Sequence, residues 1–261
     1  MKILAVANQK GGVGKSTLTV HLCYAALEAN LRVLLVDMDK QGSLSLTFPA
    51  PQGAAPGLVS SMLFGSELGT LRPQVISDKL SIIRADGEVL GRLLGTGDGI
   101  EKRPARHLRS LAADYDLCLL DTPGSLGFNP PMTVGALVAA DAVVCPFAVG
   151  LYEADALKEL AGYIKTIKSG GYNPRLRLLG LLPSKVNTKS REEREALEGL
   201  RTQLGATILP FVLAERVAVK QATMRRRPVW LGTRGAGHLK AAQEWRAACN
   251  SILGNLGDTT K

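Results

Sequence analysis

The feature that most constrains this chain is a lysine- and glycine-rich loop near its start. An apolar run at residues 3–7 precedes the loop and predicts a buried strand, and an apolar pattern from Leu18 onward predicts a helix. A strand, a glycine-rich turn and a helix in this order are the structural context of a phosphate-binding loop. The loop reads Asn8-Gln9-Lys10-Gly11-Gly12-Val13-Gly14-Lys15-Ser16-Thr17.

The residue types in this loop match the chemistry of polyphosphate binding. Glycines let backbone amides approach the phosphates, and the helix N-terminus adds free N–H donors and a partial positive charge. Lys15 is expected to sit between the outer phosphates, and the Ser16 hydroxyl to ligate Mg²⁺. A tight turn with a chance lysine is the competing interpretation, and three glycines in four residues before Lys-Ser-Thr make it improbable. The predicted nucleotide-binding residues are therefore Lys10, Gly11, Gly12, Val13, Gly14, Lys15, Ser16 and Thr17.

Two further apolar runs end in acidic residues. Residues 32–36 lead into Asp37 and Asp39, and residues 116–120 lead into Asp121. Continuous apolar runs suit parallel strands that are buried on both faces, and ligands bind at the carboxyl ends of such strands. Asp121 is thus a candidate to hold Mg²⁺, directly or through water. Its alternative role is to cap the turn that follows.

Strand and helix patterns alternate throughout, which predicts an α/β fold with a doubly wound, mostly parallel sheet flanked by helices. No repeat or boundary divides residues 1–261, so we expect one domain with a polar tail at about 254–261. Further strands are expected at 80–85, 141–146, 176–182, closed by Pro183, and 206–210. Helices are expected at about 15–29, 59–64, 103–113, 131–139, 153–168, 191–204, 215–224 and 236–253.

The net charge of +9 indicates a polyanionic partner, such as nucleic acid or acidic lipid. Basic residues gather in the C-terminal half, where phosphate contacts would give salt-sensitive binding without reading sequence. A solvated charged face remains the alternative for any single arginine. Four scattered cysteines and the lack of a leader or a long apolar stretch lead us to expect a reducing, cytoplasmic location. The candidate DNA-binding residues are Lys185, Lys189, Arg191, Lys220, Arg225, Arg226 and Arg227.

The loop resembles the deviant Walker loop of the ParA/MinD family of dimerising ATPases. Gln9 stands where the standard pattern has a glycine, and Lys10 supplies the second lysine of that family. Two later segments also resemble the family. The run 37–42, D-M-D-K-Q-G, carries Lys40 in place of a proline, and the run 121–127, D-T-P-G-S-L-G, carries Gly124 in place of a second proline. These departures suggest less rigid loops.

The resemblance implies roles for individual residues. Lys10 would reach across a dimer interface to the partner's nucleotide, so Lys10, Lys15 and Asp39 form the expected catalytic set. Asp39 would position the attacking water, and Asp37 would support the Mg²⁺ shell formed by Ser16 and Asp121. Pro210 is expected to contact the base.

The family resemblance also implies an activity. We expect a slow, partner-stimulated ATPase that binds ATP and Mg²⁺, forms a homodimer, binds DNA non-specifically and works with a ParB-type protein in plasmid or chromosome partition. Ala218, where an arginine is usual, leaves the DNA contacts open. Alternatives are a MinD-like membrane ATPase, which the polar C-terminus disfavours, a slow cargo-positioning scaffold and a metabolic kinase.

Overall fold

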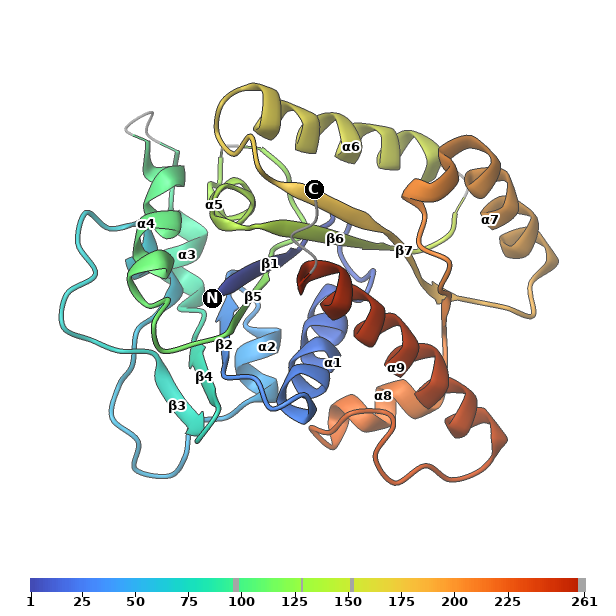
Figure 1. Cartoon of the computed structure of the whole chain (residues 1–261), viewed down its shortest axis with the longest axis horizontal. Helices are drawn as coiled ribbons and strands as arrows, with labels where there is room; N and C mark the ends of the chain where they lie inside the picture. The colour runs from blue at the N-terminus through green and yellow to red at the C-terminus, as the bar shows by residue number, and fades with distance from the viewer. Residues whose placement is uncertain (96–98, 128, 151–152, 258–261) are drawn as a thin grey trace.

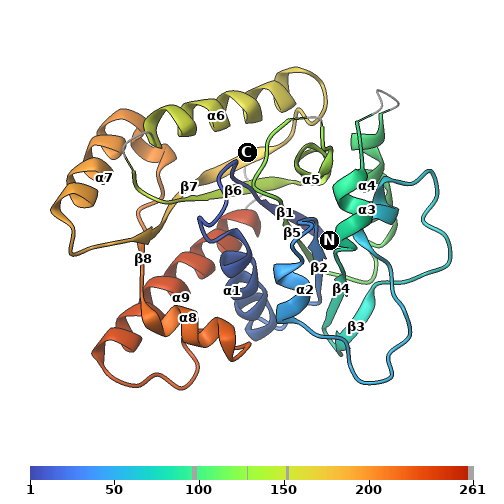
Figure 2. The same cartoon turned by 180° about the vertical axis from the view of Figure 1, so that it is seen from behind.

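The computed structural model describes residues 1–95, 99–127, 129–150 and 153–257, and a sheet runs through the middle of the molecule (Figures 1 and 2). The described residues form eight strands in the order β3-β4-β2-β5-β1-β6-β7-β8. All neighbouring strands pair in parallel except β3 and β4. The strands are β1 (Lys2–Val6), β2 (Val33–Asp37), β3 (Gln74–Ser77), β4 (Leu80–Ile83), β5 (Leu117–Asp121), β6 (Ala142–Phe147), β7 (Arg177–Val186) and β8 (Leu213–Ala214).

Helices cover both faces of this sheet (Figure 1). The α-helices are α1 (Lys15–Glu28), α2 (Ser43–Thr47), α3 (Gly87–Arg92), α4 (Arg103–Ser110), α5 (Met132–Ala139), α6 (Glu153–Ser169), α7 (Arg191–Leu204), α8 (Val217–Met224) and α9 (Ala236–Gly257). Short 3₁₀ turns lie at η1 (Ser60–Phe64), η2 (Ile100–Lys102) and η3 (Gly205–Thr207). The arrangement confirms the predicted doubly wound α/β fold.

The central strands are buried on both faces, and their side chains alternate between two apolar layers. Ile3 and Ala5 of β1 pack with α4, α5 and α6, whereas Leu4 and Val6 pack with α1, α8 and α9. This alternation follows from the two-residue period of a strand. It also explains why the sequence of β1 is continuously apolar, since neither face of the strand meets water.

The register of the central strands brings the predicted site residues to one edge. Val6 at the end of β1 pairs with Asp121 at the end of β5, and Asp121 pairs with Asp37 at the end of β2. Parallel strands place all three carboxyl ends on the same side, where the loop after β1 also begins. The Thr122 hydroxyl donates to the Val6 carbonyl at 2.9 Å and ties β5 to β1 at this edge.

Four of our expectations from the sequence differ from the structure. β7 continues through Pro183 to Val186, because Pro183 pairs with Phe147 and the pairing with β8 begins only at the next residue. The expected strand at 206–210 is wrong. Gly205 opens a 3₁₀ turn there, and Ile208 alone forms a bridge, to Leu181. α9 extends to Gly257, so the expected polar tail at 254–261 is helical over its described part, and residues 258–261 lie outside the description. The antiparallel β3 and the helix α3 were not predicted.

Within the described ranges, no helix has both the length and the apolar character that a membrane crossing requires.

Candidate functional site

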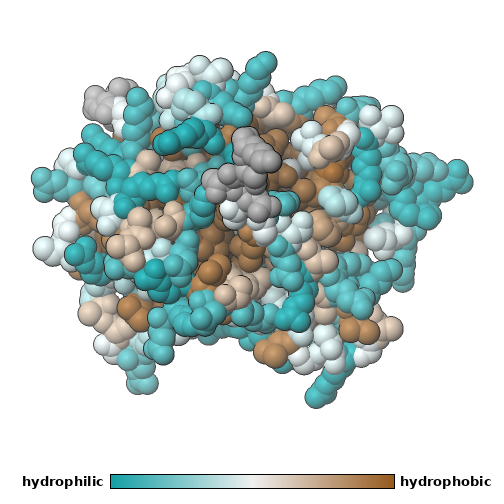
Figure 3. All heavy atoms as spheres, in the orientation of Figure 1, coloured by the Kyte–Doolittle hydropathy of each residue, from teal (hydrophilic) through white to brown (hydrophobic). Residues whose placement is uncertain are grey.

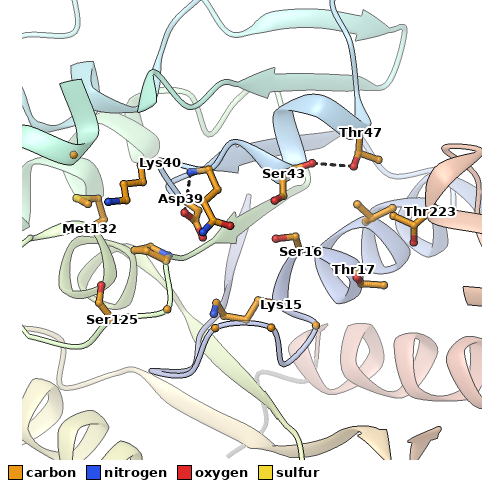
Figure 4. Close-up of a pocket in the computed structure, with 18 of the residues that line it drawn as sticks. Lys15, Ser16, Thr17, Asp39, Lys40, Ser43, Thr47, Ser125, Met132 and Thr223 are labelled. Atoms are coloured by element: carbon orange, nitrogen blue, oxygen red, sulfur yellow. Dashed lines mark hydrogen bonds between the residues drawn. The ribbon is translucent and has the colours of Figure 1, made fainter. Parts of the chain in front are cut away.

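A cavity of about 670 Å³ opens at the carboxyl edge of the sheet. Its walls come from the loop and first turn of α1, from the segment after β2 and from the turn after β5. Figure 4 shows Lys15, Ser16 and Thr17 on one side of this cavity and Asp39 and Lys40 on the other. Residues from three sequence regions that were predicted separately therefore meet around one space.

The loop has the conformation that phosphate binding requires. Gly12 and Gly14 have φ angles of 75° and 96°, a left-handed backbone region that favours glycine. Gly14 is the N-cap of α1 and offers no side chain to the amides of the first turn, so these donors remain available to an anion. The Lys15 ammonium folds back over the loop and donates to the Lys10 carbonyl at 3.0 Å.

Lys15, which lines this cavity, and Asp121 are two buried titratable side chains. Burial lowers the pKa of Lys15, and the carboxylates of Asp121 and Asp39 partly oppose that shift. Burial, together with the neighbouring carboxyl of Asp37, raises the pKa of Asp121 to about 8, although the nearby Ser16 hydroxyl and Lys15 oppose the rise. Neither carboxylate oxygen of Asp121 has a hydrogen-bond partner of good geometry among the described residues. A buried carboxyl group with open acceptor positions is suited to bind a cation.

The residues around Asp121 fit a magnesium ion. Mg²⁺ in nucleotide sites is held by one or two protein oxygens, with waters and phosphates completing the shell. Asp121 and the Ser16 hydroxyl supply such oxygens. No cluster of three or more His, Cys, Asp or Glu side chains suited to a metal occurs within the described part of the chain, so an all-protein metal cage is not formed there.

Both carboxylate oxygens of Asp37 accept hydrogen bonds from neighbouring residues. Its Oδ2 accepts from the Ser45 amide at 2.7 Å and the Ser45 hydroxyl at 2.8 Å, and its Oδ1 accepts from the Asp39 amide at 3.2 Å. These bonds fasten the start of α2 and aim the Asp39 segment toward the cavity. Asp37 therefore fits an indirect, supporting role near the ion, as the family resemblance implies.

Asp39 is partly buried and lines the cavity. Its Oδ1 accepts from the Gln41 amide at 3.0 Å, which orients the carboxylate without neutralising it (Figure 4). A carboxylate held in this way across the cavity from Lys15 is positioned to bind a water molecule.

Lys10 points away from its own cavity and pairs with Glu153 of α6 at 2.6 Å. The Lys10 side chain is 39% exposed, whereas that of Glu153 is 3% exposed and its Oε1 is buried without a partner. Gln9 also contacts α6, through the Ala156 carbonyl at 3.3 Å and Glu159 at 2.9 Å. Sequence reasoning missed Glu153, since nothing in its local pattern signals a partner 143 residues away.

Gly124 allows the turn after β5 to approach the phosphate-binding loop. A Cβ added at this position would lie 3.0 Å from the Gly11 nitrogen and 3.2 Å from the Gly11 Cα. Such contacts are with backbone atoms and cannot be relieved by a change of rotamer. Gly124, which stands where the family usually has a proline, therefore lies in close contact with the phosphate-binding loop.

A second, smaller cavity of about 270 Å³ adjoins the first. The two cavities share Gly14, Thr17, Lys185 and Thr223. The lining of the second cavity is largely apolar and includes Ser184, Ala214, Val219 and Trp245, as a site for a flat ring requires. Pro210, predicted to contact the base, is exposed and lines neither cavity. Sequence reasoning missed this second cavity because its walls come from α1, β7, β8, α8 and α9.

The predicted DNA-binding residues fall into several places. Lys189, Arg225 and Arg227 line one groove of about 910 Å³, together with Arg234 and His238, which the sequence analysis did not single out. Lys185 and Lys220 line the smaller cavity instead, and Lys220 pairs with Glu215 at 2.8 Å. Arg191 pairs with Glu195 on α7 at 2.6 Å. Arg226 is exposed beside the groove, with a left-handed φ of 52°.

The segment that carries this arginine run, residues 225–230, is fastened to α1. The Tyr24 hydroxyl donates to the Arg226 carbonyl, the Val229 amide donates to His21 Nε2 at 3.2 Å, and Trp230 Nε1 donates to Glu28 at 2.7 Å. These three α1 residues lie at i, i+3 and i+7, which is one face of a helix. His21 is fully buried, and burial lowers its pKa to about 4, so it accepts from Val229 as a neutral ring.

Comparisons with known proteins agree with this geometry. A family model described as an AAA domain, AAA_31, matches residues 1–178. Protein IncC from Escherichia coli is 34% identical over 261 residues, covering 97% of this chain and 69% of IncC. The chromosome-partitioning ATPase Soj from Thermus thermophilus is 34% identical over 225 residues, covering 84% of this chain and 83% of Soj. The chain belongs to the ParA/MinD family of P-loop ATPases.

A solved structure shares the fold and was crystallised with ligands. Cobyrinic acid a,c-diamide synthase from Mycobacterium smegmatis, with a bound ATP analogue and magnesium, superposes with a TM-score of 0.78 at 24% identity. The match covers 100% of this chain and 98% of that one. The described residues of this chain therefore share their fold with that protein.

The unpaired carboxyl of Asp121 predicts a pH-dependent stability. Because its folded-state pKa of about 8 exceeds its ordinary value of 3.8, the folded chain holds a proton that the unfolded chain releases. Stability without ligand should therefore fall as the pH rises from about 4 to 8. The neutral variant Asp121→Asn should melt several degrees above the wild type at pH 8, and the gap should narrow toward pH 5. Thermal melts over this range, without nucleotide or Mg²⁺, test this; a gap that does not change with pH would contradict it.

Proposed function

We propose that this chain is a ParA-type partition ATPase. It binds ATP and Mg²⁺ at the large cavity, forms a homodimer around the nucleotides, and then binds DNA non-specifically through the basic groove. The observation that carries this proposal is the role of α1, whose first turn lines the phosphate cavity while its His21–Tyr24–Glu28 face holds the arginine run. The similarity to Soj, a chromosome-partitioning ATPase, supports the same role.

The catalytic roles follow from the geometry of the cavity. The amides of the α1 first turn and the Lys15 ammonium would bind the phosphates, and Ser16 and Asp121 would hold Mg²⁺. Bound Mg²⁺ would supply charge neutralisation on the phosphates. Asp39 accepts a hydrogen bond from a water molecule and orients it toward the γ-phosphate. The proposed hydrolysis is slow in the chain alone, and a ParB-type partner accelerates it.

Lys10 is the residue that requires a second copy of the chain. In a single chain Glu153 holds its ammonium away from its own phosphate cavity. In the proposed dimer Lys10 leaves Glu153 and binds the partner's nucleotide. Leu46 and Met224 are 70% and 85% exposed and adjoin the cavity-lining residues Thr47 and Thr223. The proposed dimer would cover these two apolar side chains.

The base is proposed to occupy the smaller cavity rather than to lie against Pro210. The apolar lining of this cavity and its shared wall with the phosphate cavity suit an adenine that continues from the phosphates. DNA bound at the adjacent basic groove would then lie close to the nucleotide. A dimer in this state would be associated with the nucleoid.

Dimerisation is tested with Asp39→Ala, which should bind ATP without hydrolysing it. Light scattering with ATP and Mg²⁺ should give a stable dimer for Asp39→Ala and a monomer for Asp39→Ala combined with Lys10→Ala. Asp39→Ala combined with Lys158→Ala is the control, because Lys158 is an exposed lysine of α6, and it should remain dimeric. A monomeric Asp39→Ala that binds ATP normally would exclude the dimer, and full ATP turnover in Asp39→Ala would exclude the role of its carboxylate.

DNA binding is tested by replacing Arg225, Arg226 and Arg227 with alanine. Because each lost phosphate contact lowers the slope of log K against log salt by about 0.9, the triple variant should lower the slope by about 2 to 3. DNA affinity is measured with ATP between 50 and 200 mM salt. The control removes Lys158, Lys165 and Lys168 from α6, which lies on the opposite side of the sheet from α8 (Figures 1 and 2). An equal change of slope in both variants would show that net charge, not the groove, governs binding.

A further inference from the structure

A second basic hollow lies at the opposite edge of the sheet from the nucleotide cavity. It has a volume of about 550 Å³ and is built at the amino ends of β1, β6 and β7. The nucleotide loop leaves the carboxyl end of β1, which is about 13 Å away along a strand of five residues. The hollow is therefore separate from the site already described. On the face that Figure 3 shows, hydrophilic side chains are widespread, so charge by itself does not define a site.

What distinguishes this hollow is that two basic stretches far apart in the sequence converge on it. One is the arginine series of α4, and the other flanks the start of β7. The cationic side chains that line the hollow are Lys2, Arg106, Arg109, Arg175 and Arg177. Asp141 is the one acidic residue among its described lining residues.

The hollow has one carboxylate for five cationic side chains. Three of the arginines also donate to backbone carbonyls: Arg106 to Ser66, Arg109 to Met1, and Arg177 to Asn255 and Leu256. Asp141 Oδ1 accepts from Arg109 at 2.6 Å, and its Oδ2 accepts from the Ile3 amide at 2.7 Å, so both oxygens are already engaged. Neither Lys2 nor Arg175 has an ion-pair partner within the described parts of the chain. Like charges gathered around one space repel each other, and a bound anion would relieve that repulsion.

The floor of the hollow is prepared for an anion. It is formed by Val138 and small side chains at the end of α5, where a helix presents unpaired carbonyl groups and partial negative charge. Asn173 Nδ2 donates to the carbonyls of Leu137, Val138 and Ala140 at 2.9, 3.2 and 2.7 Å. These bonds occupy the helix end that would otherwise repel a negatively charged ligand.

We propose that this hollow is a second anion site, which binds a phosphate-bearing ligand with at least two negative charges. Arginine guanidinium groups and a lysine favour phosphate oxygens, through paired and charge-assisted hydrogen bonds. The volume lies within the range of small-ligand pockets. The phosphate belongs either to a free phosphorylated molecule or to the backbone of a nucleic acid, and the same side chains recognise both. The site does not depend on the proposed ATPase function.

The test uses inorganic tripolyphosphate as the probe, titrated calorimetrically into the full chain in EDTA at 100 mM salt. Lys15→Ala removes binding at the phosphate loop and should retain a binding phase within threefold of the wild-type affinity. In this background, Lys2→Gln with Arg175→Gln should weaken that phase at least tenfold. Arg72→Gln with Lys158→Gln makes the same charge change at exposed positions elsewhere and should alter it less than twofold. Thermal melts confirm that each variant is folded.

The outcomes separate the possibilities. No tripolyphosphate binding in Lys15→Ala, or equal weakening by both charge pairs, would overturn the proposal. Competition by a 20-base-pair duplex in the Lys15→Ala chain assigns the source of the phosphate. Displacement of tripolyphosphate that depends on Lys2 and Arg175 indicates a nucleic acid backbone, and persistence of binding in the presence of duplex indicates a free phosphorylated molecule. Loss of ATP binding in Lys15→Ala would report on the nucleotide cavity alone and not on the second anion site.

Discussion

The site depends on the attraction between Lys15 and Asp121, two buried side chains whose charged forms have opposite signs. Both side chains are buried, and burial disfavours the charged form of each. The register of β1, β2 and β5 forces Asp121 to lie next to the phosphate loop, because these strands end together. The fold therefore buries the Asp121 carboxyl group without a hydrogen-bond partner of good geometry among the described residues. A cation bound with phosphates in the cavity would supply the opposite charge.

Much of this arrangement could be predicted because its signals are local. A buried parallel strand is a short apolar run, and its functional end is marked by the polar residue that follows, as at Asp37 and Asp121. The left-handed turns at Gly12 and Gly14 are visible in the sequence as glycines, and the left-handed residue after α1 is an asparagine, Asn30, with a φ of 66°. The prediction that Pro183 ends its strand was wrong. A proline ends a strand only where a neighbouring strand would require its backbone amide as a hydrogen-bond donor, and this depends on the pairing of the strands.

The remaining features of the site arise from contacts between distant segments. Nothing in the local sequence around Lys10 indicates that it pairs with Glu153. In the same way, nothing around Asn173 indicates that it caps the end of α5. The basic residues show the same limit. Their clustering along the chain was evident, but their division between the groove beside α8, the smaller cavity and the hollow at the amino edge depends on how the helices pack around the sheet.

The attachment of residues 225–230 to α1 gives this helix a mechanical consequence. The helix has 14 residues and is about 21 Å long, so a tilt of about 5° at its phosphate end would move its far end by about 2 Å. The three hydrogen bonds that join His21, Tyr24 and Glu28 to residues 226–230 make the arginine run move with the far end of the helix. A change in γ-phosphate contacts too small to alter the sheet would thus be amplified into a shift in the position of the guanidinium groups.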